Sequence, residues 1–159
     1  MPKPQGTYLR TQATTKIVNQ AAQALVVKQK VEADQRDGFL SGLHAKRLDR
    51  KKLDDALELA DALRKFAKGE PGTKAGTLLK VAGEFVDLAK EVGEMLGKMK
   101  ALSGVKEVQT AIGTAKGLSA AGHKLDGAET AANALLVAVA IGVFVAAIHN
   151  VVKKLGAKL

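Results

Sequence analysis

The chain has 159 residues, which is long enough for one folded domain with a core and too short for two ordinary domains. Hydrophobic residues make up 47% and charged residues 26%, a balance that excludes global disorder. The formal net charge of +9 predicts attraction to an anionic partner, such as phospholipid headgroups, nucleic acid or an acidic protein. Cysteine is absent, which excludes disulfides and thiolate metal sites.

The N-terminal residues predict an extended arm followed by an amphipathic helix. Residues 1–10 contain two prolines and a glycine and lack the apolar segment of a signal peptide, so we expect no cleaved leader. The helix is predicted over residues 11–37, with the dipeptide Asp37-Gly38 as its stop. Its broad apolar face is formed by Ile17, Val18, Ala21, Ala22, Leu25 and Val26.

Three further amphipathic helices follow. The second is predicted from residue 41 or 43 to residue 68, because its leucines and alanines recur at the i, i+3, i+4, i+7 spacing of one helix face. The Gly-Glu-Pro-Gly segment at 69–72 then breaks the chain. The third helix, residues 77–102, has the cleanest apolar stripe. Ser103 is a candidate cap for the fourth, residues 104–121, which we expect to end at Gly122.

The fifth predicted helix differs in composition from the other four. Asp126 and Glu129 have the spacing of a capping box, and residues 130–152 then contain no charged side chain apart from the titratable His149. A helix of that length spans roughly 30 Å, the thickness of the hydrocarbon core of a bilayer. The segment is therefore interpreted either as a membrane-inserting helix or as a central helix buried on all sides by the four amphipathic ones.

Together these patterns predict an all-α fold of about five helices, four amphipathic and one long and apolar at the C-terminus. The helices would form a bundle or an extended subunit of a helical assembly. The predicted organisation is an arm over residues 1–10, an amphipathic region over 11–122 with its break at 69–72, and an apolar helix with a basic tail over 126–159.

Small residues recur at every fourth position in three of these helices. A glycine inside a helix costs about 1 kcal/mol relative to alanine, so repeated glycines require a compensating gain. Close backbone approach between helices provides one, within this chain or between copies. We therefore predict helix-packing or membrane contacts at Ala134, Ala138, Gly142, Ala146 and Phe144, and helix-packing contacts at Gly93, Gly97, Gly113 and Gly117.

Basic residues cluster at two places. The candidate residues for contact with an anionic surface are Lys46, Arg47, Arg50, Lys51 and Lys52, together with Lys153 and Lys154 after the apolar helix. The alternative for the first group is a solvated helix face, because Asp49, Asp54 and Asp55 lie among these residues. No aromatic residues are interleaved for base stacking, so nucleic acid would be bound only through non-specific charge.

The sequence carries no recognisable catalytic motif. His44, His123 and His149 are scattered, without carboxylate partners at ligand spacing. A phosphate-binding glycine loop and a nucleophile elbow are both missing from the sequence. We therefore expect a protein that is not an enzyme and that uses no cofactor.

Residues 129–154 resemble the coat helix of filamentous phages in layout: an acid at the start, an apolar run rich in small residues, then lysines. The likeness is one of shape and covers about a sixth of the chain. An apolar helix accompanied by amphipathic ones is also similar to colicin-type pore domains, although those domains use a hairpin of two apolar helices and this chain has one. Neither likeness assigns a family.

The function predicted from these features is structural. We expect a non-enzymatic subunit of a homo-oligomeric or multi-protein assembly, whose C-terminal helix associates with membrane lipid. The most concrete form is a virion or injection-apparatus component, of the internal, ejection or coat type, located in a virion or at a membrane. The alternatives are a pore-forming or membrane-perturbing effector and a soluble helical adaptor that binds a partner's helix.

Overall fold

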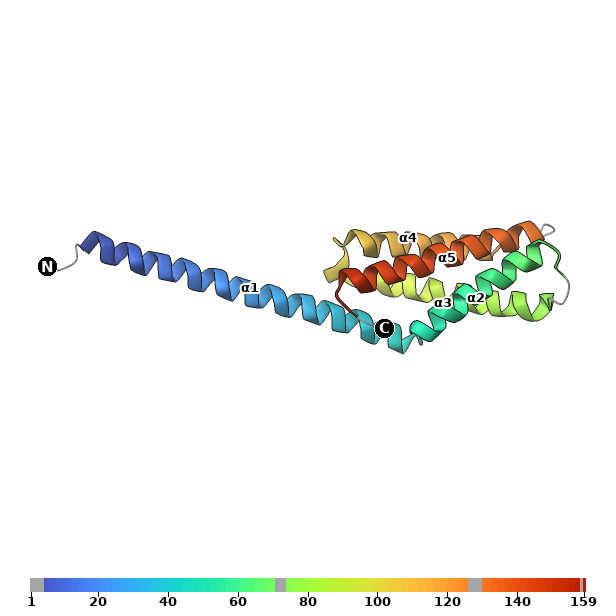
Figure 1. Ribbon diagram of the computed structural model, residues 1–159, viewed down its shortest axis with the longest axis horizontal. Helices are drawn as coiled ribbons and strands as arrows, with labels where there is room; N and C mark the ends of the chain where they lie inside the picture. The colour runs from blue at the N-terminus through green and yellow to red at the C-terminus, as the bar shows by residue number, and fades with distance from the viewer. Residues whose placement is uncertain (1–4, 71–73, 126–129, 158) are drawn as a thin grey trace. The chain divides into compact units, whose positions relative to one another are not determined.

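The computed structural model describes residues 5–70, 74–125, 130–157 and 159, including their side chains except those of residues 5–16 and 27–32. This part of the chain is mostly helical and contains no strand, which confirms the predicted all-α fold (Figure 1). The described residues form six helices, five α-helices and one short 3-10 helix, where about five helices were predicted. The helices are α1 (Gln5–Ala45), α2 (Arg50–Ala67), α3 (Ala75–Lys98), η1 (Lys100–Leu102), α4 (Lys106–Gly122) and α5 (Thr130–Lys154).

The chain divides into two compact units, residues 1–35 and residues 36–159. Helix α1 belongs to both, with its last ten residues in the second unit. This division differs from the predicted one, and residues 5–10 are helical where an extended arm was predicted. The boundary between the units falls inside a helix, where no run of glycine and proline marks it.

The predicted stop of the first helix at Asp37-Gly38 is wrong, since α1 continues to Ala45. Phe39 and Leu43 explain the continuation, because both side chains are completely buried in the core of the second unit. Packing of this kind outweighs the low helix propensity of glycine. Gly42 also has a packing role, since the Met95 side chain of α3 occupies the space where its Cβ would lie.

Helix α2 begins at Arg50, several residues later than predicted. The carboxylate of Asp49 fixes this start by accepting a hydrogen bond from the Lys52 backbone N–H at 2.8 Å. Helix α3 ends at Lys98, and Ser103 is not the cap of α4, whose N-cap position is Val105. The predicted end at Gly122 is confirmed. The predicted capping box at 126–129 lies outside the described residues.

Within the second unit, α2 to α5 form an antiparallel four-helix bundle (Figure 1). Helix α5 packs extensively on both α2 and α4, α3 packs on α4, and a smaller contact between α2 and α3 closes the bundle. Each helix therefore runs opposite to the two that it touches. The α1–α2 turn, the α3–α4 connection and the C-terminus of α5 consequently lie at one end of the bundle.

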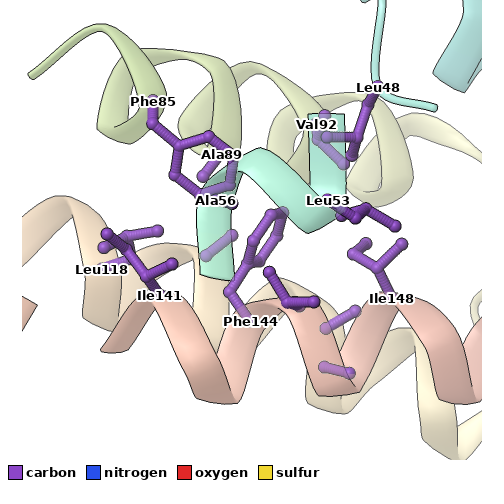
Figure 2. Close-up of a cluster of buried hydrophobic side chains, with 14 of the residues drawn as sticks. Leu48, Leu53, Ala56, Phe85, Ala89, Val92, Leu118, Ile141, Phe144 and Ile148 are labelled. Atoms are coloured by element: carbon purple, nitrogen blue, oxygen red, sulfur yellow. The ribbon is translucent and has the colours of Figure 1, made fainter. Parts of the chain in front are cut away.

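The core of the second unit consists of aliphatic side chains and three buried phenylalanines, Phe39, Phe85 and Phe144. The Phe144 ring points from α5 into the centre of the core, towards Ala56 and Phe85 (Figure 2). The Phe85 and Phe144 rings meet edge to face, with centroids 6.0 Å apart and planes at 71°, the geometry that aromatic pairs prefer. Every buried side chain in the described part of the bundle is apolar. Shape and packing, rather than buried hydrogen bonds, therefore hold these helices together.

Two glycines allow α3 and α4 to approach closely. A Cβ at Gly93 would lie 2.7 Å from the Cβ of Ala115, and a Cβ at Gly122 would lie 2.6 Å from a Cγ of Val86. Both pairs join α3 to α4 and follow the same antiparallel register. The small-residue packing predicted from sequence is therefore found at Gly93, and Gly122 adds a second contact that the predicted stripes did not include.

We predict that Gly93→Ala destabilises the protein. The added methyl group would force two helix backbones apart, and overpacking of this kind costs about 1–3 kcal/mol. The matched control is Gly83→Ala in the same helix, where a Cβ meets nothing within 4 Å and the change should gain up to about 1 kcal/mol of helix propensity. Thermal or urea denaturation measures both. Equal stability of the two variants would contradict the close approach.

Candidate membrane-contact surface

Among the described residues, α5 is the one helix that is long and apolar enough to cross a membrane. Its 25 residues correspond to roughly 37 Å. Just 44% of its most apolar 18-residue stretch is buried inside the bundle. The interpretation of α5 as a central helix buried on all sides is therefore wrong. Helix α5 is one of four bundle helices, with one face towards the core and one towards the surface.

The outward face of α5 is apolar over about four turns. It consists of Ala132, Leu135, Leu136, Val139, Val143 and Ala146, which recur three or four residues apart and so share one side of the helix. The four larger side chains are each between 46% and 53% exposed. Single exposed leucines or valines are common on protein surfaces, whereas a continuous apolar row is typical of an interaction surface.

Basic side chains lie at the C-terminal end and along one edge of this face. Lys153 and Lys154 are exposed and continue the same side of the helix, since a helical residue advances by about 100°. Beside Gly142, a guanidinium nitrogen of Arg64 on α2 lies 3.9 Å from the position of an added Cβ. Helix α5 itself contains no acidic residue. The surface thus combines an apolar row with cations and suits an amphiphilic, anionic partner.

The four residues of the predicted small-residue stripe on α5 do not pack against one common neighbour. Ala134 and Ala138 are buried, Gly142 is half-buried and Ala146 is exposed. The reason is geometric, because residues four apart advance by about 40° around a helix and the row turns away from any one neighbour. Within the chain, the predicted close backbone approach at Gly142 is wrong, since the nearest atom belongs to a flexible arginine side chain. A contact of Gly142 with another copy stays a prediction.

The other predicted packing residues fall into two groups, one that packs against a neighbouring helix and one that does not. Phe144 lies in the bundle core, so its predicted membrane contact is wrong and its predicted helix packing is found. An added Cβ at Gly97, Gly113 or Gly117 would meet no atom within 4 Å. These three glycines make no close helix contact within the described part of the chain. Gly97 instead borders an open groove of about 460 Å³ between α3 and α4.

The basic cluster at the α1–α2 turn is interleaved with acids. Lys46 pairs with Glu91 of α3 at 3.6 Å. Arg47, Lys51 and Lys52 line a surface depression of about 410 Å³ that Asp49, Asp55 and Glu84 also line. Arg50 is exposed at the start of α2. Acidic neighbours lower the local positive potential, so this cluster is a weaker anion-binding surface than its sequence predicted.

Lys153 and Lys154 lie at the same end of the bundle in a different setting. Both are exposed, and none of the ion pairs found in the described part of the chain involves them. Their charges therefore stay available to an external anion. The three histidines are also exposed, and the described residues contain no group of three or more acidic or histidine side chains placed to hold a metal ion.

Comparison of the chain with protein-family models, with curated proteins and with solved structures found no match. The surface on α5 is consequently interpreted from its own geometry and chemistry.

The difference between the two basic groups leads to a prediction. Lys153→Gln with Lys154→Gln should weaken binding to phosphatidylglycerol-containing vesicles more than Lys51→Gln with Lys52→Gln, although both pairs remove two charges. Each lysine close to an anionic surface contributes about 1 kcal/mol, and nearby acids reduce that contribution. Vesicle co-sedimentation at several salt concentrations measures the difference. Equal losses in the two double variants would show that binding depends on net charge alone.

Proposed function

We propose that this protein is a non-enzymatic helical protein that binds anionic membranes through the outward face of α5. The bundle stays folded, the apolar row enters the boundary between headgroups and acyl chains, and Lys153 and Lys154 contact lipid phosphates. The observation that carries the proposal is the half-exposed state of Leu135, Leu136, Val139 and Val143. These side chains form an apolar surface that water solvates poorly and that has lysines at one end.

The size of the apolar row explains why the lipid should be anionic. Complete burial of a Leu or Val side chain contributes about 1.5–3 kcal/mol, so the remaining half contributes about 1 kcal/mol per residue. Four such residues provide about 4 kcal/mol, which corresponds to a dissociation constant of about 1 mM. Lys153 and Lys154 together add about 2 kcal/mol on an anionic surface and nothing on a neutral one. Binding should therefore be weak on neutral lipid and salt-sensitive on anionic lipid.

The alternative functions predicted from the sequence require either a conformational change or a partner protein. A pore-forming effector would have to remove α5 from the bundle and expose the core around Phe144 and Phe85. A soluble adaptor would place a partner helix on the same outward face of α5, where the lysines would favour an acidic partner. The assignment to a virion or an injection apparatus stays a prediction of the sequence.

The proposal is tested by Val139→Asn with Val143→Asn. Both substitutions keep the net charge and replace exposed side chains, so the fold should survive them. We expect the affinity for phosphatidylglycerol-containing vesicles, measured by flotation, to fall by about tenfold or more. The loss of about 1 kcal/mol at each position removes about 2 kcal/mol of binding, and 1.4 kcal/mol corresponds to tenfold.

The matched control is Leu57→Asn with Val81→Asn, at positions on α2 and α3 that are 44% and 42% exposed. This variant should float like the wild type, and both variants should keep the helical circular dichroism spectrum. Undiminished flotation of the α5 variant would overturn the proposed function. Equal losses in both variants would reduce it to general surface hydrophobicity.

A further inference from the structure

The N-terminal segment has a charge composition unlike that of the bundle. Residues 1–31 contain five basic residues and no acidic residue, and the first acid of the chain is Glu32. This segment therefore carries more than half of the formal net charge of +9. The basic residues are Lys3, Arg10, Lys16, Lys28 and Lys30. Its electrostatic partner must be an anion that comes from outside the segment.

The same segment presents an apolar face. Within the first unit, α1 places Ile17, Val18, Leu25 and Val26 in the open, each between 55% and 65% exposed. Ala21 and Ala22 are exposed as well and lie on the same side by helical spacing. The four larger side chains are more exposed than those on the outward face of α5, where the most exposed reaches 53%. We call these six residues the apolar face of α1.

We propose that the N-terminal part of α1 is a second membrane contact, an amphipathic helix that lies in the plane of an anionic bilayer. The apolar face of α1 would enter the acyl boundary, and the acid-free sequence around it would attract lipid phosphates. The inference rests on the proposed function for the choice of a bilayer as partner. It assigns a separate surface, on the other compact unit.

Charge selects the bilayer over a second copy of this chain. Two N-terminal segments paired along their apolar faces would bring together five positive charges from each copy, with no acid in residues 1–31 of either to pair with them. The apolar residues select the bilayer over nucleic acid. A phosphate backbone gives exposed Ile, Val and Leu side chains nothing apolar to contact, and Tyr8 is the one aromatic residue of the segment.

Two weak contacts on one chain should strengthen each other. Once one surface is bound, the other is held near the same bilayer at a high effective concentration. Loss of either surface should therefore weaken vesicle binding by about tenfold or more. Loss of both should leave only the weak, salt-sensitive attraction of the lysines to anionic lipid.

The experiment compares four full-length proteins: wild type, Ile17→Asn with Leu25→Asn, Val139→Asn with Val143→Asn, and the variant with all four substitutions. Every change replaces an exposed apolar side chain with a neutral polar one, so net charge is constant. Flotation is measured with phosphatidylcholine vesicles, with and without phosphatidylglycerol. Light scattering gives the oligomeric state of each protein, and binding to duplex DNA is measured in parallel.

We expect the α1 variant, Ile17→Asn with Leu25→Asn, to bind phosphatidylglycerol-containing vesicles about tenfold less tightly than the wild type. Its mass and its DNA binding should be unchanged. Wild-type vesicle binding by the α1 variant, together with weakened binding by the α5 variant, would overturn the inference and leave the proposed function standing. The converse result would remove the proposed role of α5 and leave α1 as the contact. A smaller mass for the α1 variant would identify a second copy as the partner, and a loss confined to DNA binding would identify nucleic acid. Both of these results overturn the inference.

Discussion

The burial of α5 between α2 and α4 is the interaction on which the rest of the bundle depends. Ten of the thirty buried hydrophobic residues in the described part of the chain belong to this one helix. Phe144 extends from it across the core to Phe85, so α5 also meets the helix that lies opposite it in the bundle. The core has no buried polar side chain among the described residues. Stability therefore comes from apolar burial and close packing.

Because α5 is apolar on all sides, it packs well in this core and also exposes apolar side chains at the surface. The other three helices of the bundle expose mainly charged and small residues, whereas α5 exposes Leu135, Leu136, Val139 and Val143. A core needs one apolar face of a helix, and α5 has a second. About half of each large side chain on the second face stays exposed in the folded chain. Under the proposed function, this face enters a lipid boundary, and the lysines that follow it contact the anionic headgroups.

Much of the fold could be predicted from the sequence, because hydrophobic periodicity identifies long helices reliably. The position of α5 and the end of α4 at Gly122 were predicted closely. The continuation of α1 past Gly38 could not be, since it depends on Phe39 and Leu43 finding a core formed by residues far along the chain. The start of α2 depends on a side-chain cap at Asp49. For α1, the low helix propensity of Asp37-Gly38 favoured an end of the helix at this point, whereas the helix continues to Ala45.

The candidate surface was predicted less well. Spacing alone identified small-residue stripes but not the direction in which they face, so Gly93 meets a helix while Gly97, Gly113 and Gly117 do not. Hydropathy identified α5 as membrane-compatible, but the residues left exposed depend on how α2 and α4 cover it. The basic cluster at the α1–α2 turn is a weaker anion-binding surface than the sequence predicted, because the fold brings Glu84 and Glu91 of α3 close to it.

The absence of cysteine from the chain allows the most direct test of the account. A single cysteine carrying an environment-sensitive fluorophore is placed at Val139 on the outward face of α5, at Ile148 on its inward face, or at Val81 on α3. Vesicles containing phosphatidylglycerol and a lipid-borne quencher are then added. We expect quenching and a blue shift at Val139, with no change at Ile148 or Val81. An unchanged signal at Val139 would contradict membrane contact through α5, and equal quenching at Ile148 would show that α5 leaves the bundle.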